Sequence, residues 1–124
     1  MTIAAQSAQL LADLGVQHPD RMLGPLMKAS LENALSSGES ALTGPVARGD
    51  AGTVRAHRAA LEAHDAPDTR QAYLGMARAT ALRALERGVL SPAQGEAILA
   101  ALADVPGGSG PPRPPQDGAS GPPP

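Results

Sequence analysis

The 124-residue sequence contains no cysteine, no tryptophan and no phenylalanine, and Tyr73 is its single residue of the Phe, Trp and Tyr class. Without cysteine the chain forms no disulfide, thiolate nucleophile or cysteine-ligated zinc site. With one aromatic side chain, a core must be built from Leu, Val, Ile, Met and Ala. Such residues suit closely packed helices but give no stacking surface.

An excess of positive charge is also missing. The chain has ten Lys and Arg against twelve Asp and Glu, which gives a formal net charge of -2. A nucleic-acid role normally needs a basic patch, and no segment supplies one. The longest uncharged apolar runs are shorter than the roughly 20 residues of a membrane span, and the N-terminus does not read as a secretory signal. We therefore expect a cytoplasmic protein that binds neither nucleic acid nor membrane.

The apolar residues that are present recur at helical spacing, and no segment alternates with the period of a strand. The pattern predicts an all-α fold, a compact bundle of about five helices within residues 1–105. The expected helices are 2–14, 19–37, from a cap at Asp50 to near His64, 67–87 and 92–103.

Capping signals mark the ends of these helices. Gly15, Gly38 and Gly88 are expected stops, because glycine adopts the left-handed conformation that follows a helix. Asp50 should accept the backbone N–H near Thr53, and Ser91 begins a capping-box pattern. Within the second helix, Gly24-Pro25 predicts a kink or a later start at Gly24, because proline removes a helical hydrogen bond.

A proline- and glycine-rich tail follows, with thirteen Pro or Gly among the nineteen residues 106–124. Such a segment buries too little apolar area to offset its loss of conformational entropy, so we expect a disordered tail. Its run at 111–115 has the extended character that aromatic-lined grooves accept, although an inert tail is the simpler interpretation.

The sequence carries little that indicates catalysis by this chain alone. No strand, glycine-rich turn and helix succeed one another as dinucleotide binding requires. His57 and His64 lie two helical turns apart, too far to share a metal ion, so solvated or capping histidines are expected. No serine lies in a nucleophile elbow, and the tripeptide 48–50, Arg-Gly-Asp, is expected to be structural rather than adhesive.

Two segments resemble a known family: 23–35, LGPLMKASLENAL, and 41–50, ALTGPVARGD, of which residues 43–50 are the specific part. They look like the C-terminal helical domain of the Rossmann-like oxidoreductases with domain of unknown function 2520. These are relatives of the 6-phosphogluconate dehydrogenase and pyrroline-5-carboxylate reductase group. Tyr73 and residues 77–80 fit the same resemblance, which runs from about residue 4 to residue 87.

The resemblance implies a substrate-side domain that makes a homodimer or pairs with a separate Rossmann domain, which would hold NAD(P). The implied substrate-binding residues are Asn33, Thr43 and Arg48, and the implied cleft-shaping residues are Gly44, Pro45 and Asp50. The related hydroxyacid dehydrogenases space a catalytic Lys and Asn four residues apart. Here Lys28 and Asn33 are five apart, about 140° around a helix, so no catalytic residue is assigned.

We therefore expect a domain of an NAD(P)-dependent oxidoreductase-like protein that holds no cofactor and is inactive alone. Met1 would then be a truncated or misassigned start. Arg48 either binds an anionic substrate group or braces its loop against Asp50 or a backbone carbonyl. Two other interpretations remain: a non-catalytic helical module for protein–protein interaction, and a remnant whose shortened first helix leaves an apolar edge exposed.

Overall fold

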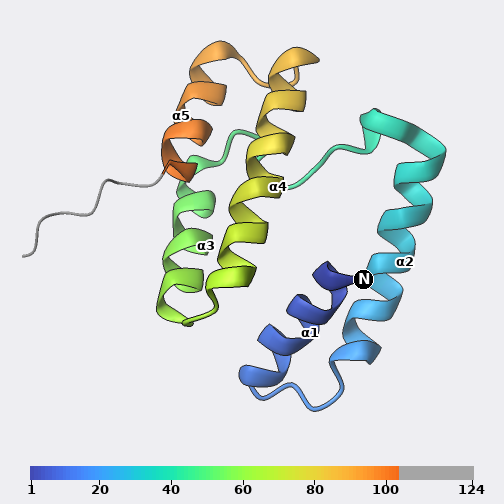
Figure 1. Cartoon of the computed structure of the whole chain (residues 1–124). Helices are drawn as coiled ribbons and strands as arrows, with labels where there is room; N and C mark the ends of the chain where they lie inside the picture. The colour runs from blue at the N-terminus through green and yellow to red at the C-terminus, as the bar shows by residue number, and fades with distance from the viewer. Residues whose placement is uncertain (104–124) are drawn as a thin grey trace, which may run out of the picture.

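The computed structural model describes residues 1–103, and this range contains five α-helices, one short 3-10 helix and no strand (Figure 1). In chain order they are α1 Thr2–Asp13, α2 Pro19–Ser37, η1 Gly38–Ala41, α3 Ala51–Ala63, α4 Pro67–Glu86 and α5 Pro92–Leu102. The all-α prediction is confirmed. The predicted tail, residues 106–124, lies outside the described residues.

Glycine residues terminate three of the helices at their C-terminal ends. After α1, Gly15 has a φ of 92°, and the amide of Val16 reaches back to the Leu11 carbonyl at 2.9 Å. This hydrogen bond from beyond the helix end satisfies one of the carbonyls that every helix leaves unpaired at its C-terminal end. Gly38 and Gly88, at the ends of α2 and α4, also have positive φ values, 56° and 70°, which favour glycine.

The N-caps of α3 and α5 lie at the residues that the sequence predicts. Asp50 Oδ1 accepts the Thr53 amide at 3.0 Å, and its Oδ2 accepts the Thr53 hydroxyl at 2.6 Å. At α5, the Ser91 hydroxyl accepts the Gln94 amide, while the Gln94 side chain accepts the Ser91 amide at 2.9 Å. Both predicted caps are therefore confirmed.

The helix α2 is uninterrupted and includes Pro25 in its interior. A helix that begins only at Gly24 is therefore wrong. Pro25 cannot donate to the Arg21 carbonyl, but Gly24 and Pro25 are both exposed, where water can bond that carbonyl instead.

The core lies within the α3–α5 group (Figure 1). Val54 of α3 and Ile98 of α5 are fully buried, and α4 contributes buried Ala77 and Ala81 to the same cluster. Because these α4 residues are small, the three helix backbones approach closely. The remaining members of the core cluster are Val46, Ala101 and Leu102.

The helices α4 and α5 pack tightly at Gly95. A Cβ atom at this position would lie 2.6 Å from Leu85 Cγ, well inside van der Waals contact. Gly95 is therefore required by packing, because only a residue without a side chain lets Leu85 lie across α5.

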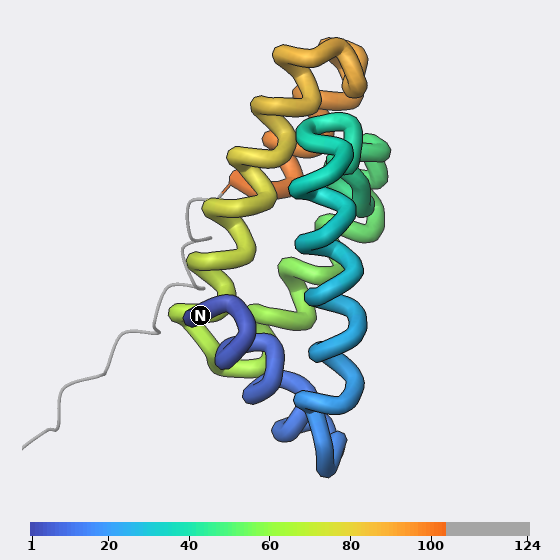
Figure 2. The backbone as a smooth tube through the Cα atoms, turned by 90° about the vertical axis from the view of Figure 1, so that its right-hand side faces the viewer, coloured from blue at the N-terminus to red at the C-terminus, as the bar shows by residue number. Residues whose placement is uncertain are grey.

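The helices α1 and α2 form a hairpin beside this group (Figures 1 and 2). Neither helix contains a buried residue. Polar contacts link the hairpin to the α3–α5 group: His64 Nε2 lies 3.0 Å from Asp13 Oδ2, and Gln6 donates to Asp68 at 3.2 Å. Beyond the end of α2, Glu39 forms ion pairs with arginines at the C-terminal end of α4, Arg83 and Arg87.

The substitution Gly95→Ala should destabilise the protein by about 1 to 2 kcal/mol, because overpacking against Leu85 outweighs the higher helix propensity of alanine. Gly75→Ala in α4 is the matched control. A Cβ there would meet no atom within 4 Å, so this variant should be stabilised by about 0.5 to 1 kcal/mol. Urea unfolding monitored by circular dichroism measures both, and equal stabilisation by the two variants would contradict the packing argument.

A second prediction concerns the cap of α3. Hydrogen bonds from the Thr53 hydroxyl and then its amide hold the pKa of Asp50 below its ordinary value of 3.8. The resulting stabilisation is complete above that value and is lost as the pH falls through the lower, folded-state pKa. Asparagine caps a helix about as well but does not titrate.

We therefore expect Asp50→Asn to match the wild type at neutral pH and to lose less stability than the wild type below about pH 4. Asp50→Ala, which lacks an acceptor, should be less stable at neutral pH. Urea midpoints measured at several pH values test this. An identical acid loss in the wild type and Asp50→Asn would show that another carboxylate is responsible.

Candidate functional site

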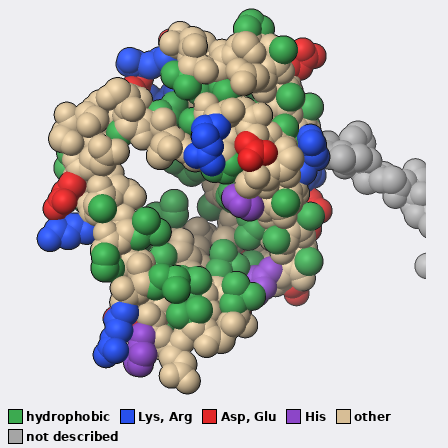
Figure 3. Space-filling view, turned by 180° about the vertical axis from the view of Figure 1, so that it is seen from behind, with side chains coloured by type: hydrophobic (Ala, Val, Ile, Leu, Met, Phe, Trp, Pro, Cys, Tyr) green, Lys and Arg blue, Asp and Glu red, His purple; other side chains and the backbone are tan. Residues whose placement is uncertain are grey.

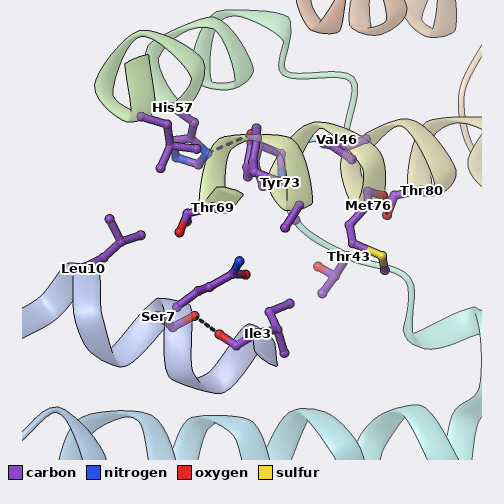
Figure 4. A pocket seen from close by; sticks show the side chains of 16 residues that line it. Ile3, Ser7, Leu10, Thr43, Val46, His57, Thr69, Tyr73, Met76 and Thr80 are labelled. Carbon is purple, nitrogen blue, oxygen red and sulfur yellow. Dashed lines mark hydrogen bonds between the residues drawn. The ribbon is translucent and has the colours of Figure 1, made fainter. Parts of the chain in front are cut away.

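A cavity of about 350 Å³ lies between α1, the loop after η1, α3 and α4 (Figure 4). Leu10, Ser7 and Ile3 of α1 face Thr69 and Tyr73 of α4 across it. The full lining is Ile3, Gln6, Ser7 and Leu10 from α1; Thr43, Gly44, Pro45 and Val46 from the loop; His57 and Leu61 from α3; and Thr69, Ala72, Tyr73, Met76, Ala77 and Thr80 from α4.

The loop that closes one side of the cavity is a tight turn. Gly44 adopts a φ of 100°, which favours glycine, and its carbonyl accepts the Arg48 amide at 3.1 Å. The Asp50 amide donates to the Pro45 carbonyl at 2.8 Å. These bonds fold the loop so that Val46 is buried in the core while the residues before it remain on the cavity wall.

One polar pair stands on the cavity wall. His57 Nδ1 lies 3.1 Å from the Tyr73 hydroxyl, and the two rings meet edge to face with centroids 5.8 Å apart. Burial raises the pKa of Tyr73, so its hydroxyl stays protonated at neutral pH. The Tyr73 hydroxyl can therefore donate to or accept from a bound molecule.

Two other hydroxyls of the wall bond to carbonyls of their own helices. The Ser7 hydroxyl donates to the Ile3 carbonyl at 2.8 Å, and the Thr80 hydroxyl donates to the Met76 carbonyl at 2.9 Å. The lining contains no Lys, Arg, Asp or Glu. The surface of the cavity is therefore mostly apolar, and His57 and Tyr73 form a hydrogen-bonded pair on its wall.

The structure brings three of the six predicted site residues to this cavity: Thr43, Gly44 and Pro45. The other three lie outside its lining. Asn33 is exposed on α2, where its side-chain oxygen accepts the Ser37 hydroxyl at 3.3 Å, and Asp50 caps α3.

Arg48 is exposed on the loop, and its positive charge contributes to the lowered pKa of Asp50, after the two hydrogen bonds from Thr53. The predicted contact of Arg48 with a substrate anion stays a prediction.

Sequence reasoning missed the His57–Tyr73 pair. The two residues are sixteen positions apart on different helices, and no local pattern relates them.

His64 lies at the C-terminal end of α3, where its side chain hydrogen bonds with Asp13. A hydrogen bond from Gln9 and then the contact with His64 lower the pKa of Asp13.

The described residues do not fit NAD(P) or a metal ion. No strand precedes a glycine-rich turn in residues 1–103, so the backbone amides that hold a pyrophosphate at a helix N-terminus are not assembled there. The same part of the chain holds no group of three or more His, Asp or Glu side chains that could ligate a metal. None of its helices is both long and apolar enough to span a bilayer.

Comparison with known proteins identifies a family. Neither the curated proteins nor the solved structures include a significant match to the chain. Residues 1–80, well over half of the chain, match the family described as Domain of unknown function (DUF2520). This match covers α1, α2, the loop, α3 and the part of α4 that lines the cavity, and on this basis the chain belongs to the DUF2520 family.

Proposed function

We propose that this chain is the substrate-side and dimerisation domain of an NAD(P)-dependent oxidoreductase-like protein, and that it is inactive without a cofactor-binding half. The resemblance of residues 43–50 to such proteins supports the oxidoreductase part of the proposal. The cavity supports a substrate-side role, because the same loop forms one of its walls.

The observation that carries the dimerisation part is the surface of α2. This helix has 19 residues and none is buried, although it contains many large apolar side chains. The exposed ones are Met22, Leu26, Met27, Leu31 and Leu35, with exposed fractions from 37% to 78%. We call these five residues the α2 face.

The α2 face is too wide for one neighbour to cover. At about 100° per residue, its five side chains spread over more than half of the helix circumference. The opposite side carries Lys28 and Glu32, whose charged atoms are 4.0 Å apart and well exposed. Since α1 packs along only one side of α2, much of the apolar arc needs a partner from outside the described residues.

Asn33 and Arg48 complete the proposal as candidate substrate contacts. Both are exposed, so each could reach a substrate only where a second domain or a second copy closes over it. A cofactor-binding half placed against this surface would bring NAD(P) to the domain, which itself does not fit the cofactor.

Dimerisation is tested by the mass of the chain in solution. The wild type should sediment near twice 12.4 kDa, and Leu31→Glu should raise the dissociation constant about tenfold or more, because a buried carboxylate without a partner opposes association. Val89→Glu, at a residue with a similar exposed fraction outside the α2 face, is the matched control and should remain dimeric. A wild type that stays monomeric at high concentration would refute this part of the proposal.

The oxidoreductase part is tested separately, by adding the cofactor-binding domain of another DUF2520 family member in trans. We expect the two domains to form a complex that binds NADH or NADPH. Self-association without any affinity for that domain would instead support a non-catalytic helical module for protein–protein interaction.

A further inference from the structure

The size of the cavity suits a small organic molecule. Its volume of about 350 Å³ lies within the range of roughly 300 to 1,000 Å³ that is common for ligand pockets. Since a water molecule takes about 30 Å³ in the liquid, the cavity has room for a molecule of roughly ten non-hydrogen atoms. Helices on two sides and the loop after η1 border it, and exposed side chains such as Ile3 and Met76 line its open side (Figure 4).

The chemistry of the wall selects against charge. No Lys, Arg, Asp or Glu lines the cavity, so an ionic ligand would lose hydration without the counter-charge that these side chains supply, and His57 is the one imidazole on the wall. Most of the surface of the wall is apolar, and the Ser7 and Thr80 hydroxyls already donate to backbone carbonyls. An uncharged, mainly apolar molecule meets the fewest unsatisfied groups there.

The His57–Tyr73 pair adds one directional contact. If the Tyr73 hydroxyl donates to His57 Nδ1, its oxygen keeps a lone pair that can accept from a ligand. In the other tautomer, His57 Nδ1–H donates to the Tyr73 oxygen, and the Tyr73 hydroxyl is free to donate to a ligand. A ligand hydroxyl matches both arrangements, and a carbonyl matches the second.

We propose that this cavity binds an uncharged, mainly apolar small molecule of about ten non-hydrogen atoms whose single hydroxyl or carbonyl group hydrogen bonds to the His57–Tyr73 pair. Binding of this kind requires no cofactor, so the site stands whether or not the chain serves an oxidoreductase. A second copy of the chain is the rival occupant, and the experiment separates the two.

The sequence provides a local probe. Tyr73 is the only Tyr in a chain without Trp or Phe, so intrinsic fluorescence reports on the cavity wall alone. The full-length chain is titrated with octan-1-ol and, separately, with octanoate, which has the same chain length but a negative charge. We expect octan-1-ol to change the Tyr73 emission in a saturable way and octanoate to bind at least about tenfold more weakly.

Variants place the ligand within the cavity. Thr69 points into the space, and Thr69→Leu should fill part of it and reduce octan-1-ol affinity about tenfold by calorimetry without changing the helical signal (Figure 4). Ala79→Leu adds bulk at an exposed α4 position outside the lining and should bind as the wild type does. Tyr73→Phe should weaken binding about three- to tenfold, since it removes one neutral hydrogen bond.

Three results would overturn the proposal. Octanoate affinity equal to that of octan-1-ol would show that charge is not selected against. Octan-1-ol affinity unchanged by Thr69→Leu, or absent altogether, would show that the cavity is not its site. A Tyr73 signal that depends on protein concentration but not on octan-1-ol would assign the cavity to a second copy.

Discussion

The packing of α3, α4 and α5 around Ile98 and Val54 is the constraint on which the remaining structure depends. This packing is possible because the residues at the helix contacts are small. They are Ala77 and Ala81 on α4 and Gly95 on α5. Close helix backbones bury the few branched side chains completely, and the resulting core is compact but contains little apolar volume. The loop before α3 joins this core through Val46, which is how the wall of the cavity is fixed.

This division of the molecule leaves apolar surface in two places. One is the cavity, where α1 faces α4 without filling the space between them (Figure 4). The other is the α2 face, and the space-filling view shows an opening bordered by hydrophobic side chains between the hairpin and the remaining helices (Figure 3). The proposed small-molecule site and the proposed surface for a protein partner are thus separate features of one fold.

The sequence predicted the elements well because their signals are local. The caps at Asp50 and Ser91 and the stops at Gly15 and Gly88 depend on residues within one helical turn, and the structure has all four. The apolar band of α2 also predicted a helix correctly, but periodicity does not say which neighbour covers an apolar side. The sequence therefore could not tell that none of its residues would be buried in this chain.

The candidate site was predictable only in part, for the same reason. Residues 43–45 belong to one contiguous string, and the structure places all three on the cavity wall. The His57–Tyr73 pair and the facing side chains of α1 come together only through the arrangement of three helices, which no spacing in the sequence encodes. Asn33, like the loop, belongs to a segment that resembles the family, but it lies on the hairpin and does not line the cavity.

The hairpin has a further consequence for the dynamics of the chain. Because α1 and α2 contribute no buried residue, their opening would expose almost nothing of the core around Ile98. Segments with few buried contacts exchange their amide hydrogens through local openings rather than through global unfolding. The chain should therefore behave as two cooperative units, with the α1–α2 amides exchanging early and those of α3–α5 protected to nearly the full stability of the protein.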